Sequence, residues 1–110
     1  MALEITVTGG IVVVMIPLRF DTGNAPAIEA ELRTMLAGSP EKVVLDFSGT
    51  DYIASSGMRV LLQITRDLMK SGSRVALAGL RPAVHKIFAM AGFTSIFSIY
   101  GSREEAMRAL

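Results

Sequence analysis

Short apolar segments alternate with a longer segment of helical periodicity in the second half of the sequence, and this alternation constrains the fold more than any other feature. Residues 43–47 and 75–78 are almost wholly apolar and are too short to be buried helices. Between them, one helical face is predicted to contain Met58, Leu61, Leu62, Thr65, Leu68 and Met69. Strands joined by a helix form βαβ units and lie parallel in one sheet. The pattern therefore predicts an α/β protein in which residues 43–47 form a central strand.

The N-terminal segment has the period of a strand. Residues 3–8 alternate between apolar and polar side chains, which is typical of a strand with one exposed face. Gly9 and Gly10 follow and can supply the positive φ angles of a tight turn, and residues 11–16 are almost continuously apolar. Two such runs around a glycine pair predict a β-hairpin whose second strand is buried.

Helix-start signals follow the hairpin. Residues 19–24 are mostly polar and are predicted to be an irregular connection. Asn24 can cap the next helix, and Pro26 is tolerated in its first turn. Pro82 is predicted to open a later helix in the same way.

The C-terminal part completes the predicted architecture. Gly92 has the position of a left-handed helix cap, and residues 96–99 are expected to form a short edge strand. Residues 102–105 have the form of a capping box that starts a final helix. The expected fold is a mixed sheet of four or five strands, a hairpin followed by βαβ crossovers, packed with about four helices.

The bulk composition excludes several classes of protein. The chain has 110 residues, enough for a single domain, 1–110, with its own core. Its formal charge of +1 gives no reason to expect nucleic acid as a partner. It has no cysteine, and neither a signal peptide nor a membrane-inserted segment is expected. We therefore expect a cytoplasmic protein.

The sequence contains few candidate catalytic residues. A hydrolase nucleophile elbow needs glycine two residues before and after its serine, and Ser55 has Ile53 and Gly57 at those positions. The single histidine, His85, is interpreted as a partly exposed helix residue and not as a catalytic base. No spacing suggests a metal site, and no glycine pattern suggests a nucleotide site. No cofactor is expected, and a serine hydrolase that uses Ser55 and His85 is the weakest hypothesis.

Residues 53–58 are the most informative motif and have two interpretations. They read Ile-Ala-Ser-Ser-Gly-Met, where a loop from the central strand enters a helix. In the simpler interpretation, one serine is the N-cap and Gly57 lets the helix pack closely. In the functional interpretation, a serine at the helix start accepts a phosphate, which the unpaired N–H groups and the positive end of the helix dipole can accommodate.

A phosphate at this position would act on binding more than on folding. Phosphoserine adds roughly −1.5 to −2 charges, and a helix start gains about 0.3–1 kcal/mol from a nearby anion. An interface that closes over the serine loses roughly 2–3 kcal/mol through one like-charge repulsion at about 6 Å. Phosphorylation could therefore release a partner without unfolding the domain.

Residues 43–62 resemble the signature of STAS domains, named for sulphate transporters and anti-sigma-factor antagonists. They read Val-Val-Leu-Asp-Phe-Ser-Gly-Thr-Asp-Tyr-Ile-Ala-Ser-Ser-Gly-Met-Arg-Val-Leu-Leu. Residues 20–21, 77–84 and 91–93 fall where that family has similar segments. The resemblance covers nearly the whole chain and implies the STAS fold. The stand-alone bacterial members are anti-sigma factor antagonists.

The resemblance also implies a mechanism of transcription regulation by partner switching. The unphosphorylated antagonist binds an anti-sigma factor that is also a serine kinase, which frees the sigma factor. The kinase then phosphorylates the antagonist with ATP, the antagonist dissociates, and a serine phosphatase resets it. The family's acceptor corresponds to Ser55, and Asp21 matches an acidic residue beside it. The implied contact surface comprises Asp21, Thr22, Ser55, Ser56, Gly57, Met58 and Arg59.

One departure from the family pattern favours a second hypothesis. Many members have aspartate immediately before the acceptor, where this chain has Ala54. A degenerate acceptor site would suit a domain that is not phosphorylated. The alternative function is therefore an accessory subunit of a transporter or a signalling scaffold with the same fold.

Overall fold

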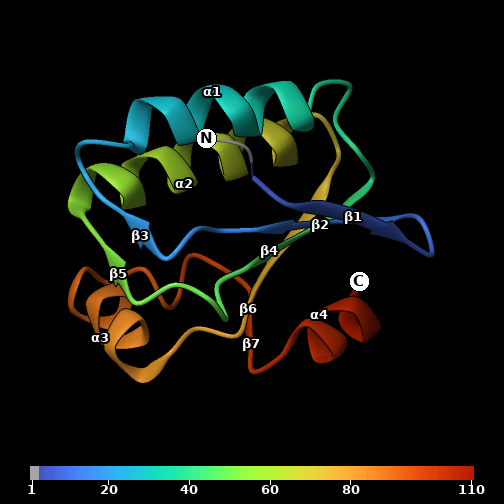
Figure 1. Cartoon of the computed structure of the whole chain (residues 1–110). Coiled ribbons are helices and arrows are strands. Elements are labelled where there is room, and N and C mark those ends of the chain that lie inside the picture. The colour runs from blue at the N-terminus through green and yellow to red at the C-terminus, as the bar shows by residue number, and fades with distance from the viewer. Residues whose placement is uncertain (1–2) are drawn as a thin grey trace.

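A mixed sheet of five strands forms the centre of the structure (Figure 1). The structure is a computed structural model that describes residues 3–110. In the described part of the chain the strand order is β1-β2-β4-β6-β7, with β1 (Ile5–Thr8), β2 (Ile11–Met15), β4 (Lys42–Asp46), β6 (Arg74–Ala78) and β7 (Ile99–Tyr100). β1 is antiparallel to β2, and each other neighbouring pair is parallel. The hairpin, the crossovers and the fold class are confirmed.

The helices cover the two faces of this sheet unequally. Within residues 3–110 they are α1 (Ala25–Met35), α2 (Ser55–Lys70), α3 (Pro82–Met90) and α4 (Arg103–Ala109). Figure 1 shows α1 and α2 together on one side of the sheet and α4 on the other. None of these helices has both the length and the apolar character needed to cross a bilayer.

Charged side chains join α1 to α2 on their outer surface. The Arg33 guanidinium of α1 lies 3.1 Å from the Asp67 carboxylate of α2 and 3.1 Å from Glu29. Hydrogen bonds to Asp67 and then to Glu29 raise the pKa of Arg33 above its ordinary value. All three side chains are at least 36% exposed, so solvent screening keeps the contribution of these pairs to stability small.

The main core lies between the sheet and the α1–α2 layer. β4 is central, as predicted, and Val43, Val44 and Leu45 are fully buried. Phe47, just after β4, contacts Phe88 of α3 edge-on, with ring centroids 6.0 Å apart. Edge-on packing of this kind adds roughly 0.5–1.5 kcal/mol to the gain from burying the rings. These aromatic rings therefore attach α3 to the carboxyl end of the sheet.

Two predictions about buried faces are wrong. Leu3 is buried, but Ile5 and Val7 are 41% and 68% exposed, because β1 is the edge of the sheet. Met69 was predicted on the inner face of α2 and is 59% exposed, whereas Ile64 is buried there. A helix advances about 100° per residue, and in the last turns of α2 this rotation leaves Leu68 in the core and Met69 toward solvent.

The predicted irregular connection at residues 19–24 contains a strand. β3 (Arg19–Phe20) pairs parallel with β5 (Tyr52–Ile53) and forms a separate two-stranded sheet. The predicted edge strand at 96–99 is displaced, since only residue 99 of that range belongs to β7.

Two predicted signals at helix ends are confirmed. Gly92 follows α3 with a φ of 76°, as predicted for a left-handed cap. The Glu105 N–H donates to Ser102 Oγ at 3.1 Å, which confirms the capping box at the start of α4. The Glu105 carboxylate accepts from the N–H of Gly101, one residue earlier than the usual capping-box partner.

Replacement of Phe88 should test how α3 is attached. Phe88 is fully buried and makes edge contacts with Phe47 and Phe97. Phe88→Ala should lower the free energy of unfolding by about 3–5 kcal/mol, because it removes these contacts and leaves a cavity. Met90→Ala is the matched control on the same helix, since Met90 is 80% exposed, and should change stability by no more than about 0.5 kcal/mol. Urea unfolding followed by circular dichroism measures both, and equal losses would contradict this account.

Candidate functional site

The β3–β5 pair brings the segment before α1 beside the start of α2. Phe20 pairs with Ile53, and both side chains are buried. One residue further on, the N–H of Ala54 donates to the carbonyl of Phe20 at 2.8 Å. The chain leaves both parallel strands in the same direction. The residues that follow β3 and those that follow β5 therefore meet at one edge of the molecule.

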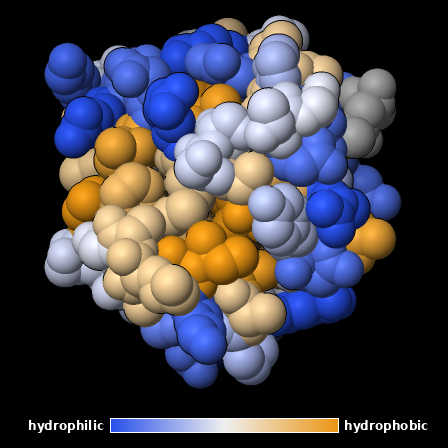
Figure 2. All heavy atoms as spheres, turned by 90° about the vertical axis from the view of Figure 1, so that its left-hand side faces the viewer, coloured by the Kyte–Doolittle hydropathy of each residue, from blue (hydrophilic) through white to orange (hydrophobic). Residues whose placement is uncertain are grey.

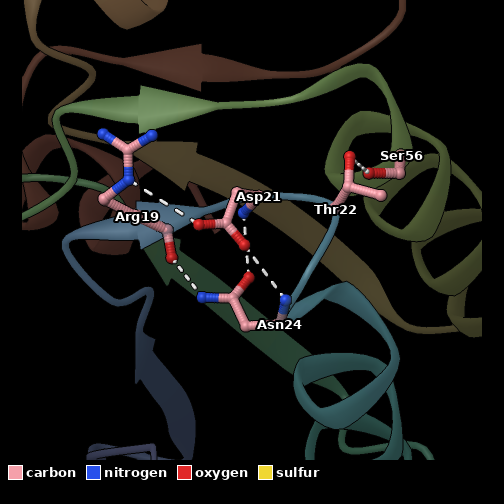
Figure 3. Close-up of polar contacts among 5 residues, drawn as sticks. All are labelled: Arg19, Asp21, Thr22, Asn24 and Ser56. Atoms are coloured by element: carbon pink, nitrogen blue, oxygen red, sulfur yellow. Dashed lines mark hydrogen bonds and ion pairs between the residues drawn. The ribbon is translucent and has the colours of Figure 1, made fainter.

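A hydrogen bond between two hydroxyl groups joins the two segments. Ser56 Oγ donates to Thr22 Oγ1 at 3.1 Å, and Figure 3 shows the two side chains facing one another. Thr22 and Ser55 are exposed, while Ser56 is half-buried. The structure thus brings together two segments that are 34 positions apart in the sequence, as the predicted site requires.

Asp21 is held in a tight turn that precedes α1 (Figure 3). The N–H of Asp21 donates to Asn24 Oδ1 at 2.8 Å, and the N–H of Asn24 donates to Asp21 Oδ1 at 3.0 Å. Asn24 Nδ2 also donates to the carbonyl of Arg19 at 2.7 Å. Asn24 occupies the N-cap position, but its side chain makes no cap hydrogen bond to the helix because these loop contacts use it. The predicted position of Asn24 at the N-cap of α1 is therefore right, but the predicted hydrogen bond from its side chain to the helix is wrong.

Arg19 forms the border of this loop. Its Nε lies 3.6 Å from Asp21 Oδ2, and its guanidinium carbon lies 4.7 Å from the centroid of the Tyr52 ring. The Asp21 side chain remains about one third exposed. Sequence reasoning missed the place of Arg19, Asn24 and Tyr52 at this site, although Asp and Asn are residues whose side chains often bond the nearby backbone in turns.

The start of α2 differs from the simpler sequence interpretation, in which a serine is the N-cap. The N-cap is Ala54, in an extended conformation, and it has no side chain that could cap the helix. Ser55 is the first helical residue, and Ser56 donates its hydroxyl proton to Thr22. Within residues 3–110, the first-turn N–H groups of α2 therefore donate to no capping side chain. They are available to an incoming anion.

Gly57 allows α2 to lie against β3. It is buried, and a Cβ atom at this position would lie 2.8 Å from Phe20 Cδ1 and 3.0 Å from the Phe20 carbonyl oxygen. Both distances are shorter than ordinary contacts, so any larger residue would push the helix away. The expectation that glycine permits close packing here is confirmed.

The predicted contact residues fall into two groups. Ser55 and Arg59 are exposed, as Thr22 is, and Asp21 and Ser56 are half-buried beside them. Met58 is only 4% exposed and packs in the main core, so it supports the surface from beneath and presents no side chain to a partner. The predicted contact role of Met58 is therefore corrected. The same holds for Gly57, which is buried against Phe20.

The surface around these segments is mixed in polarity. Figure 2 shows the side of the molecule on which α1 and α2 begin, with apolar side chains from near its centre to its left-hand edge and hydrophilic side chains above, to the right and below. Apolar and polar side chains thus lie side by side on this face, as they do at protein-binding surfaces.

The serine hydrolase hypothesis gains no support from the geometry. His85 is exposed on α3, and no hydrogen bond joins it to Ser55 in the described residues. Residues 3–110 likewise contain no group of three or more His, Asp or Glu side chains placed to hold a metal ion.

Comparison with known proteins identifies the family. The model of the STAS domain family matches residues 2–106. The chain belongs to the STAS domain family. A relative from Bordetella bronchiseptica, named "Putative anti-sigma factor antagonist BtrV", is 38% identical over 81% of this chain and 77% of its own length.

Solved structures share the fold of this STAS domain. An anti-sigma factor antagonist from Mycobacterium paratuberculosis superposes with a TM-score of 0.89 at 24% identity, over 98% of this chain and 92% of that one. The Bacillus cell fate determinant SpoIIAA in its phosphorylated form gives a TM-score of 0.72 at 24% identity, over 98% of each chain. At these identities the likeness establishes the fold alone.

Substitution of Gly57 should show whether the stability of the domain depends on the close packing of α2 against Phe20. Gly57→Ala should destabilise the domain by about 1–3 kcal/mol, because the new Cβ meets the ring and backbone of Phe20. Gly49→Ala is the matched control, since a Cβ at Gly49 meets nothing within 4 Å, and it should be within about 0.5 kcal/mol of the parent. Chemical denaturation measures both changes. Equal stability of the two variants would show that α2 does not depend on this contact.

Proposed function

We propose that this STAS domain is an anti-sigma factor antagonist whose binding to an anti-sigma factor is controlled by phosphorylation of Ser55. The observation that carries the proposal is the position of Ser55, exposed and first in an α2 helix that has no side-chain cap. The name of the Bordetella relative, at 38% identity, supports the same pathway.

The start of α2 is suited to a phosphate. The first-turn N–H groups lie at the positive end of a 16-residue helix and have no side chain as acceptor. A phosphate on Ser55 Oγ would approach these donors without displacing an existing cap. The preceding residue is Ala54, so no carboxylate at that position repels the phosphate. The modified domain is therefore expected to remain folded.

In this proposal the chain is a binding module and a substrate, and its partners carry out the chemistry. The unphosphorylated domain binds an anti-sigma factor that is also a serine kinase, and the sigma factor is released. The kinase transfers the γ-phosphoryl group of ATP to Ser55 Oγ, and ADP leaves. A serine phosphatase then hydrolyses the phosphoserine to serine and inorganic phosphate. Because ATP and sigma factors act in the cytoplasm, the proposed place of action is the cytoplasm.

The proposed contact surface surrounds Ser55. Asp21 and Thr22 come from the loop before α1, and Ser56 and Arg59 come from the first turns of α2. The hydrogen bonds of Asn24 and Ser56 fix this loop against the helix, so little ordering remains to be done on binding. A pre-ordered surface of this kind loses affinity when one charge is added at its centre.

Phosphate transfer is expected at one hydroxyl only. With ATP and the cognate anti-sigma kinase, the parent chain should gain one phosphate and Ser55→Ala should gain none. Ser56→Ala is the matched control and should still gain one phosphate on Ser55, at a lower rate than the parent because it loses the hydrogen bond to Thr22. Intact-mass spectrometry with peptide mapping measures the result. Phosphate on Ser55→Ala, or none on the parent chain, would refute the proposed acceptor.

Charge at position 55 should weaken the complex. Ser55→Glu should lower the affinity for the anti-sigma factor about a hundredfold, because one like-charge repulsion at about 6 Å costs roughly 2–3 kcal/mol. Ser55→Gln has nearly the same shape without the charge and should bind within about tenfold of the parent. Titration calorimetry gives both constants. Equal affinities for the Glu and Gln variants would rule out an electrostatic switch.

A transporter accessory subunit or signalling scaffold is the second candidate, and Ala54 in place of the usual aspartate favours it. Affinity purification of the tagged chain from its own cells separates the candidates. Recovery of a serine kinase that phosphorylates the chain supports the first. Recovery of transporter subunits, with unmodified Ser55, would replace it with the second.

A further inference from the structure

β1 is an open edge of the sheet with exposed apolar side chains. It pairs with β2 on one side, and the strand order places no described strand on its other side. All of its residues are exposed, with Ile5 at 41% and Val7 at 68%. The opposite edge is β7, which has only two residues. Very short edge strands resist pairing, so β1 is the edge at which another strand can add.

The hydrogen bonding of the hairpin determines which backbone groups face outward. The N–H of Met15 donates to the carbonyl of Glu4 at 2.9 Å, so these two form a hydrogen-bonded pair across β1 and β2. In an antiparallel ladder such pairs alternate with non-bonded pairs. Thr6 and Thr8 therefore direct their backbone groups toward β2. The N–H and C=O groups of Ile5 and Val7 point away from the sheet.

Within Ile5–Thr8 the outward edge carries none of the usual protection against pairing, and the nearest charge is that of Glu4, just before the strand. Proteins protect edge strands with charged side chains, proline or a bulge. β1 reads Ile-Thr-Val-Thr, and its pairing with β2 is continuous over all four positions. High β-propensity and zero charge make this segment a good template for a further strand.

The exposed apolar side chains lie on the face of the sheet that carries α1. Leu3, Ile5 and Val7 share one face by alternation, and Leu3 is buried in the main core with its N–H donating to Glu31 of α1. Val12, the register partner of Val7, packs partly buried against the same core. Ile5 and Val7 therefore extend the core beyond the cover that α1 provides.

We propose that β1 pairs antiparallel with β1 of a second copy of this chain and forms a symmetric dimer with a continuous sheet. A two-fold axis through Thr6 places Ile5 opposite Val7 of the second copy, and Val7 opposite Ile5. Each of these pairs exchanges both of its backbone hydrogen bonds, which uses the groups that point outward. Thr6 then faces Thr6, as a non-hydrogen-bonded pair.

A second copy fits this edge because the edge is complementary to itself. In the proposed register the apolar side chains meet apolar side chains, and Glu4 lies opposite Thr8, so no like charges face one another. A two-fold axis perpendicular to the sheet keeps both α1 helices on the same face. The exposed Ile5 and Val7 of both copies then form one cluster between these helices. The pairing uses no residue of the Ser55 surface, so both sites stay accessible.

The oligomeric state and its sensitivity to charge test the proposal. Analytical ultracentrifugation of the full chain should give the mass of two chains, and Val7→Lys should give the mass of one while keeping the parent's circular dichroism spectrum. Met90→Lys is the matched control, because Met90 is an exposed apolar residue away from β1, and it should stay dimeric. A parent chain that is monomeric up to its solubility limit would overturn the proposal, as would a dimer that Val7→Lys leaves intact.

Cysteine cross-linking tests the register independently. The chain has no cysteine, so any disulfide in a single-cysteine variant must join two copies. A non-hydrogen-bonded pair has its Cα atoms about 4.5 Å apart, within the range of a disulfide. Thr6→Cys should therefore oxidise rapidly to a covalent dimer. Thr8→Cys, equally exposed but opposite Glu4 in the proposed dimer, should not. The reverse result, or no difference between the two, would overturn the proposed pairing.

Discussion

The close approach of α2 to Phe20 is the contact on which the candidate site depends. The Phe20 ring is fully buried, and its carbonyl accepts the N–H of Ala54 at 2.8 Å. Because a Cβ at position 57 would lie 2.8 Å from the ring, glycine is the residue that lets the helix begin there. This contact sets the position of the first turn of α2. The exposed Ser55 surface is thereby held by the hydrophobic core beneath it.

The architecture could be predicted from sequence wherever a signal extends over several residues. The apolar run at 43–47 and the alternation at 3–8 each repeat often enough to reveal a strand. β3 and β5 have two residues each, and two residues cannot display a period. Their pairing is set by the tertiary contact between Phe20 and the start of α2. The exposure of Ile5 and Val7 could not be predicted either. Periodicity shows which residues share a face of a strand, but it does not show which strand lies at the edge of the sheet.

The candidate site was predictable in its location but not in its chemistry. The Ser-Ser-Gly motif marked a helix start, and the family resemblance selected the first serine as the acceptor. The pattern of residue types alone treats the two hydroxyls alike. Their surroundings differ in the structure, because Ser56 is bonded to Thr22 while Ser55 is exposed as the first residue of α2. The helix begins after a residue that cannot cap it, and no local propensity predicts Ala54 in that position.

The two-residue length of the β3–β5 pair has a consequence for the dynamics of this domain. A pair this short is not stable by itself and persists only while α2 and the core support it. Phe20 and Ile53 are both buried in the main core, so the pair can open only if these two side chains leave the core with it. The order of the segment next to Ser55 therefore comes from the core beneath it and not from the few hydrogen bonds of the pair itself.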